Sequence, residues 1–205
     1  PQGGERMLIE ALTGRRLNSK MLPLDVGCIV DNVATVLAIR DAIKYDRPLI
    51  STVMTLTGDG LNTPCNVEVP VGTDFQFIVE SHGGLKENVE KIISGGPMMG
   101  SSLISLHIPA IKTSSSILAF THDEVALNAP TACIRCGRCI DACPSHLIPQ
   151  KLYQASLKND INTFIQLNGM ECIECGCCSY VCPAKRNMTQ AIRKCKSTVA
   201  SLKRK

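Results

Sequence analysis

The chain has 205 residues, of which 44% are hydrophobic and 20% are charged, and its formal net charge is +4. These proportions exclude a disordered tail and a membrane-embedded helical bundle. Aromatic residues make up only 3% and tryptophan is absent. Because few side chains can stack on bases, nucleic-acid binding is not expected.

The first segment, residues 1–46, is expected to contain two helices joined by a basic loop. Residues 5–12 form the first helix, which Gly14 can end, and Asn32 is a suitable N-cap for the second. Two helices of this kind bury too little surface to form a domain alone. The segment is therefore interpreted as the C-terminal part of a larger domain.

The middle segment, residues 47–121, is expected to form a small β-grasp-like domain with a connector. Alternation places four residues on one face of its first strand: Ile50, Thr52, Met54 and Leu56. A helix capped by Thr73 or Asp74 should follow and end at Gly83 and Gly84. The remaining strands are predicted at residues 66–69, 89–93 and 117–120.

One uncharged stretch, residues 92–111, is long enough to cross a bilayer. It contains glycines, prolines and serines, which would break a helix and leave polar groups in lipid. No membrane span is therefore expected in this stretch.

The third segment, residues 122–205, repeats one cysteine motif, which accounts for eight of the twelve cysteines. Each copy has the spacing C-x2-C-x2-C-x3-C-P, and the second copy follows the first after 39 residues. In bacterial ferredoxins this spacing binds 4Fe–4S clusters, and the fourth cysteine ligates the cluster of the other copy. The sequence therefore predicts two clusters, one held by Cys133, Cys136, Cys139 and Cys182 and the other by Cys172, Cys175, Cys178 and Cys143.

Two zinc sites with four cysteines each are the alternative interpretation. Such sites usually show C-x2-C pairs separated by a longer loop, so the tripled spacing followed by proline favours iron–sulfur clusters. Cysteines used in this way indicate a reducing compartment. Residues 150–158 and 162–167 look helical, which predicts a helix-rich dicluster domain.

Two neighbouring clusters can pass single electrons. The sequence offers no general base, nucleophilic triad or nucleotide-phosphate loop beside them. No catalytic residue is therefore assigned.

Together with the repeat, two other elements resemble the C subunit of the Rnf complex, an ion-pumping ferredoxin:NAD oxidoreductase. They are P-Q-G-G-E at residues 1–5 and G-G-P-M-M-G at residues 95–100, and the motifs themselves read A-C-I-R-C-G-R-C and E-C-I-E-C-G-C-C-S-Y-V-C-P-A-K. The resemblance implies an α+β fold in three parts. These are a fragment of a flavoprotein domain, a β-grasp domain of the soluble-ligand-binding type, and a helical dicluster ferredoxin domain.

In this family, and in the related flavoprotein subunit of respiratory complex I, a preceding domain holds FMN and NADH. The resemblance assigns Gly4 and Glu5 to a G-E element of the flavin pocket and Asn32 to an N-N-V-E-T element. Three residues depart from the family's pattern: Arg6, Asp31 and Ala34. FMN binding is therefore expected only in the full-length protein, and a purely structural role for Asn32 as a helix cap is the alternative.

The resemblance implies an electron-relay subunit that is enzymatic only within its complex. Its partners would be the other Rnf subunits, with ferredoxin or NADH reached through the complex, and it would lie peripherally at the cytoplasmic face of the bacterial cell membrane. Two alternatives stay open: a cobalamin reductase flavoprotein of similar architecture, and a redox-sensing ligand-binding module. The basic residues 193–205 fit a solvated helix face or contact with anionic lipid or a membrane subunit.

Overall fold

The computed structural model describes residues 4–123 and 127–203. Pro1, Gln2 and Gly3 of the P-Q-G-G-E run, and Arg204 and Lys205 of the basic end, lie outside the described residues. The chain divides into two compact units, one formed by Pro1–Val30 with Asn128–Lys205 and the other by Asp31–Leu127. The α+β fold class is confirmed, and the predicted domain limits at residues 46 and 121 stay predictions.

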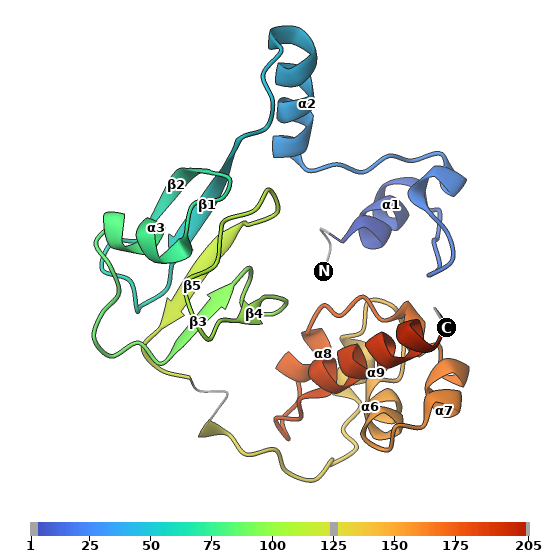
Figure 1. Cartoon of the computed structure of the whole chain (residues 1–205). Helices are drawn as coiled ribbons and strands as arrows, with labels where there is room; N and C mark the ends of the chain where they lie inside the picture. Colours follow the sequence, from blue (N-terminus) through green and yellow to red (C-terminus); the bar gives the residue numbers. More distant parts are fainter. Residues whose placement is uncertain (1–3, 124–126, 204–205) are drawn as a thin grey trace. The chain divides into compact units, whose positions relative to one another are not determined.

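The unit of residues 31–127 is built on one mixed five-stranded sheet with the order β2-β1-β5-β3-β4 (Figure 1). Strands β1 and β5 pair in parallel, and the other neighbours are antiparallel. The strands are β1 Ser51–Thr57, β2 Cys65–Pro70, β3 Lys91–Ser94, β4 Ser101–Ser102 and β5 Ser116–Phe120, and helix α3 spans Phe75–Ser81. All the predicted strands are found, whereas the two-residue strand β4 was not predicted.

The core of this unit follows from the alternation in β1. Met54 and Leu56 are buried, and they pack in one cluster with Phe75 of α3. The Asp74 side chain accepts a hydrogen bond from the Gln76 backbone at 2.9 Å, which caps α3 as expected. Ile50 was expected on the buried face but is 69% exposed, because β1 begins one residue later.

Helix α2, Val33–Tyr45, belongs to the same unit and begins after its N-cap Asn32. The Asn32 side chain accepts a hydrogen bond from the Ala34 backbone at 2.9 Å. None of the residues of α2 is buried among the described residues, and Val33 and Ile43 are 76% and 83% exposed. The helix that the sequence predicts is therefore present with its apolar side chains uncovered.

The other unit is helical. Its N-terminal part holds α1, which spans Glu5–Thr13 and ends at Gly14 with φ of 71°, and a short 3-10 helix, Pro23–Val26. Its C-terminal part contains α5 Arg138–Asp141, α6 Pro149–Leu157, α7 Ile161–Gln166, the 3-10 helix Gly169–Glu171, α8 Cys177–Tyr180 and α9 Met188–Lys203. Leu152 of α6, Phe164 of α7 and Ile192 of α9 meet in one buried cluster.

A search of the described residues finds no helix that is both long and apolar enough to cross a membrane. The uncharged stretch at residues 92–111, where the sequence predicts no span, contains the end of β3 and all of β4.

We expect Leu56→Ala to destabilise the sheet by about 2–5 kcal/mol, because it leaves a cavity at a side chain that is 1% exposed. Its matched control is Val53→Ala on the same strand, where the side chain is 66% exposed and the cost should stay within about 0.5 kcal/mol. Hydrogen exchange of the β1 amides in the full chain measures both values. Equal losses in the two variants would contradict the assignment of the buried face.

Candidate metal centres

The cysteine repeat is also a repeat of backbone conformation. Three pairs of residues separated by 39 positions have left-handed φ angles: Arg135 and Glu174 (56° and 57°), Gly137 and Gly176 (80° and 83°), and His146 and Lys185 (both 50°). Helices α6 and α9, which follow the motifs, also begin 39 residues apart. The duplication therefore covers a unit of loop, short helix and longer helix, and it explains why glycine recurs at the left-handed position before each short helix.

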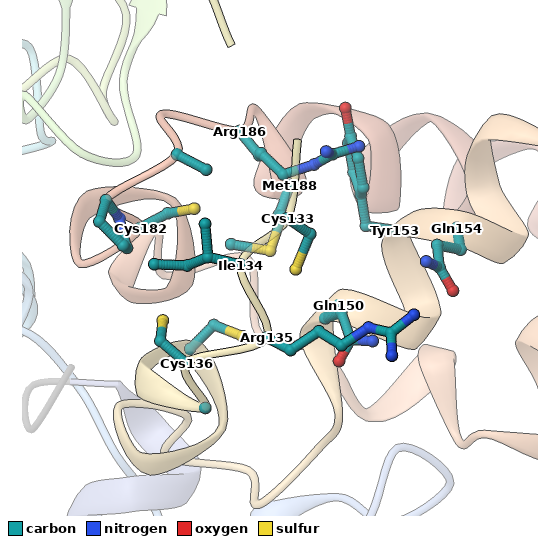
Figure 2. A pocket seen from close by; sticks show the side chains of 14 residues that line it. Cys133, Ile134, Arg135, Cys136, Gln150, Tyr153, Gln154, Cys182, Arg186 and Met188 are labelled. Carbon is teal, nitrogen blue, oxygen red and sulfur yellow. The ribbon is translucent and has the colours of Figure 1, made fainter. Parts of the chain in front are cut away.

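One pocket collects three cysteines of the first motif and the last cysteine of the second. Its cysteines are Cys133, Cys136, Cys139 and Cys182. Figure 2 shows Cys133 and Cys136 on the loop before α5 and Cys182 on the segment that follows α8. We call this space the first pocket.

A second pocket collects the complementary set, which consists of Cys143, Cys172, Cys175 and Cys178. Cys177 and Cys178 are adjacent in the sequence, and it is Cys178 that lines the pocket, in agreement with the 39-residue register. We call this space the second pocket. The two pockets group the eight cysteines in the crossed arrangement that the spacing predicts.

Both pockets have the chemistry that a 4Fe–4S cluster requires, which is four sulfur donors and nearby backbone amides. In the second pocket the Leu147 amide donates to Cys143 Sγ at 3.4 Å, and the Glu174 amide donates to Cys172 Sγ at 3.4 Å. Burial raises the pKa of the Cys172 and Cys178 thiols. Metal binding there must therefore release protons from thiols that are neutral in the free chain.

The cysteines of the two pockets differ in exposure. Cys133 and Cys136 in the first pocket are exposed, whereas all four cysteines of the second pocket are half-buried. Among the described residues, no three His, Cys, Asp or Glu side chains converge as closely as the binding of a single metal ion would require.

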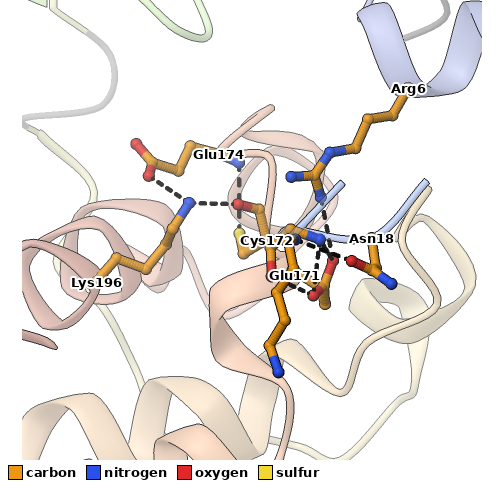
Figure 3. A network of polar contacts seen from close by, with 8 residues as sticks. Arg6, Asn18, Glu171, Cys172, Glu174 and Lys196 are labelled. Atoms are coloured by element: carbon orange, nitrogen blue, oxygen red, sulfur yellow. Dashed lines mark hydrogen bonds and ion pairs between the residues drawn. The ribbon is translucent and has the colours of Figure 1, made fainter. Parts of the chain in front are cut away.

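A charged network supports the second pocket. Lys196 of α9 donates to the backbone oxygen of Cys172 at 2.6 Å and lies 2.9 Å from the Glu174 carboxylate, as Figure 3 shows. Arg193, one turn earlier on α9, pairs with the same carboxylate at 2.8 Å. Burial opposes the ionisation of Glu174, but Lys196 and Arg193 outweigh it and lower the pKa of this carboxyl.

A second network joins the N-terminal segment to the dicluster part through Glu171. Arg6 Nη1 lies 3.1 Å from Glu171 Oε2, and the Ser19 amide donates to the same oxygen at 2.7 Å. The Ser19 hydroxyl donates to the other carboxylate oxygen. Asn18 accepts a hydrogen bond from the Lys20 amide at 2.9 Å, which forms the turn that presents Ser19 (Figure 3). We call the contacts of Glu171 with Arg6 and Ser19 the Glu171 clamp.

The flavin residues that the resemblance implies lie in different units. Gly4 is the N-cap of α1 and Glu5 is its first residue, in the unit that holds the cysteines. Asn32 lies in the other unit and caps α2. The assignment of these three residues to a flavin pocket stays a prediction.

Sequence reasoning missed the two acidic residues of these networks. Glu171 and Glu174 look like ordinary surface charges in the sequence, and the only signal was their difference from Ala132 and Arg135 at the equivalent positions of the first motif. The basic C-terminal helix was interpreted as a solvated face or a lipid contact. Two of its cations, Arg193 and Lys196, instead support the second motif.

Three family models match the chain in succession. Residues 1–41 match the Nuo51 FMN-binding domain, residues 53–101 match the SLBB domain, and residues 126–183 match the 4Fe-4S dicluster domain. The last match indicates two 4Fe–4S clusters in the region of the repeat.

Curated relatives share much of the sequence. The C subunit of the proton-translocating ferredoxin:NAD(+) oxidoreductase complex of Clostridium ljungdahlii is 49% identical over 74% of this chain and 33% of its own length. The C subunit of the Na(+)-translocating ferredoxin:NAD(+) oxidoreductase complex of Acetobacterium woodii is 40% identical over the whole chain and 46% of its own length. The C subunit of the ion-translocating oxidoreductase complex of Pseudomonas aeruginosa is 42% identical over 78% of the chain and 21% of its own length. The chain thus spans less than half the length of these relatives.

The crossed grouping of cysteines yields a matched pair of variants. Cys143→Ser should alter the spectrum of the cluster in the second pocket, and Cys182→Ser that of the cluster in the first, because each residue lines the pocket of the other motif. Electron paramagnetic resonance of the dithionite-reduced protein measures both effects. Damage from Cys143→Ser that is confined to the first pocket would refute crossed ligation.

Proposed function

Because the chain belongs to the C-subunit family of ion-translocating ferredoxin:NAD(+) oxidoreductase complexes, we propose that it relays single electrons within such a complex. The observation that carries the proposal is the pair of four-cysteine pockets built on one helical core. Each pocket would ligate one 4Fe–4S cluster through the crossed cysteine sets. When bound, the two clusters accept and release one electron each.

The residues around the pockets hold the ligands in place. Helices α6 and α9 pack through Leu152 and Ile192, so the segments that carry Cys143 and Cys182 are tied to a common core. Because each motif would supply the fourth cysteine ligand of the other motif's cluster, loss of one cluster should destabilise both motifs. Backbone amides directed at sulfur stabilise the thiolate form and contribute to the reduction potential.

The partners in this proposal are the other subunits of the complex, with ferredoxin or NADH reached through it. The names of the relatives support this assignment, since they are subunits of complexes that couple ferredoxin:NAD(+) oxidoreduction to the translocation of protons or Na(+). In the proposal the chain lies peripherally at the cytoplasmic face of the bacterial cell membrane. FMN and NADH would be held by the full-length protein, to which the match at residues 1–41 contributes one part.

Anaerobic reconstitution tests the clusters directly. The purified chain should take up about eight irons, four for each cluster, and show an absorbance that dithionite bleaches. The measurement is iron and zinc analysis together with visible spectroscopy. Stoichiometric zinc without an iron-dependent absorbance would refute the proposal.

NADH should not reduce the clusters of the 205-residue chain, whereas dithionite should. Hydride oxidation requires a flavin that turns a two-electron donor into single electrons, and Gly4, Glu5 and Asn32 supply only part of a flavin pocket. The eight cysteines of the repeat all lie after Pro130 and do not depend on that pocket. Absorbance changes after NADH addition, with and without FMN, test this, and FMN-dependent bleaching by NADH would contradict it.

A further inference from the structure

Helix α9 places one hydroxyl group against a cysteine of the second pocket. Thr189, the second residue of α9, is 6% exposed, and its Oγ1 lies 3.7 Å from Sγ of Cys178. The same oxygen lies 2.8 Å from Oγ of Ser179, and the Thr189 amide donates to that Oγ at 2.9 Å. Two hydroxyl groups are thus linked in a row that ends on the cysteine sulfur.

The chemistry of the sulfur fixes the direction of these hydrogen bonds. A cysteine that ligates iron is a thiolate, which accepts a hydrogen bond but cannot donate one. The Thr189 hydroxyl would then donate to Cys178, and its oxygen would accept from the Ser179 hydroxyl. Both hydrogen bonds would point toward the sulfur, and bonds aligned in this way strengthen one another.

The first motif has no such pair of hydroxyl groups. Ile140 and Gln150 stand 39 residues before Ser179 and Thr189, at the equivalent positions. Burial raises the pKa of the Cys139 thiol, and the Gln150 backbone amide opposes this effect. In the second motif the equivalent amide donates to Ser179 instead, and the threonine hydroxyl faces the sulfur. The two copies therefore use different donors at equivalent cysteines.

From this arrangement we propose that Thr189 is a positioning residue that acts through Cys178 and raises the reduction potential of the cluster in the second pocket. The inference rests on the proposed function. The step is a one-electron reduction of the cluster by an external donor such as dithionite, in which no covalent bond forms or breaks. The added electron makes the cluster and its sulfur ligands more negative, and a donor directed at sulfur stabilises that charge. The hydroxyl therefore favours the reduced form of this cluster over its oxidised form.

Redox titration of the full chain with both clusters tests this role. Cys143→Ser and Cys182→Ser assign the paramagnetic signals to the second and to the first pocket. Thr189→Val keeps the shape of the side chain and removes its hydroxyl. At a fixed applied potential, the ratio of reduced to oxidised cluster in the second pocket should fall about tenfold, the order expected for one hydrogen bond to a charged acceptor. This change is about 59 mV for a one-electron couple, and the signal of the first pocket should not shift.

Two further comparisons separate the hydroxyl from the packing of the side chain. Thr189→Ser keeps the hydroxyl and Thr189→Ala removes it, and both lack the γ-methyl group. The same tenfold difference should therefore separate these two variants, which also serve if Thr189→Val does not hold both clusters. The matched control is Thr198→Val on the same helix, where the hydroxyl donates to the Lys194 backbone oxygen at 3.1 Å and both potentials should stay at their wild-type values. Equal potentials of the second pocket within each pair would overturn the proposal, as would an equal shift of both signals.

This inference and the proposed function fail in different ways. If the wild-type chain takes up fewer than two clusters, the proposed function itself is wrong. If both clusters form and their potentials do not depend on the Thr189 hydroxyl, the proposed function stands and the role of Thr189 is wrong.

Discussion

The fourth cysteine of each motif lies with the first three cysteines of the other, and the rest of the dicluster part depends on this crossing. After Cys139 in the first pocket, the chain places Cys143 in the second pocket and forms helices α6 and α7. It then returns to the second pocket before Cys182 completes the first. Helices α6 and α9 occupy equivalent places after the two motifs. Leu152 of α6 and Ile192 of α9 belong to one buried core. In the proposed crossed ligation, the cluster ligands and the packed helices would constrain the same fold, as expected where metal binding and folding are coupled.

Local chemistry made much of this fold predictable. Gly14 at the end of α1, Asn32 before α2 and Asp74 before α3 act through neighbouring backbone groups, so the sequence alone indicates them. The cysteine spacing is equally local, because the first three cysteines of each motif follow at three-residue steps and fit one loop around one cluster site. The limits of the strands are not local in this sense, because a period of two does not show where pairing begins. Ile50 was therefore expected in the first strand, although it lies one residue before β1.

The long-range polar contacts were beyond the reach of periodicity. Arg6 and Glu171 are 165 residues apart, and nothing in either neighbourhood names the other as a partner. The same holds for Glu174 and its cations on α9, since the basic run looked like an ordinary solvated helix end. Such pairs depend on how separate segments pack, which side-chain patterns do not encode.

Identical cysteine sets cannot by themselves make the two proposed clusters differ in reduction potential. The difference must come from positions that do not ligate, and the duplication shows them by comparison of its two copies. Solvent exposure and local charge both change a cluster's reduction potential, and the copies differ in both. The first has two exposed cysteines beside Arg135, whereas the second has half-buried cysteines beside the Glu174 carboxylate, which pairs with Arg193 and Lys196. The copies thus kept the eight cysteines of the repeat and diverged in the residues around them.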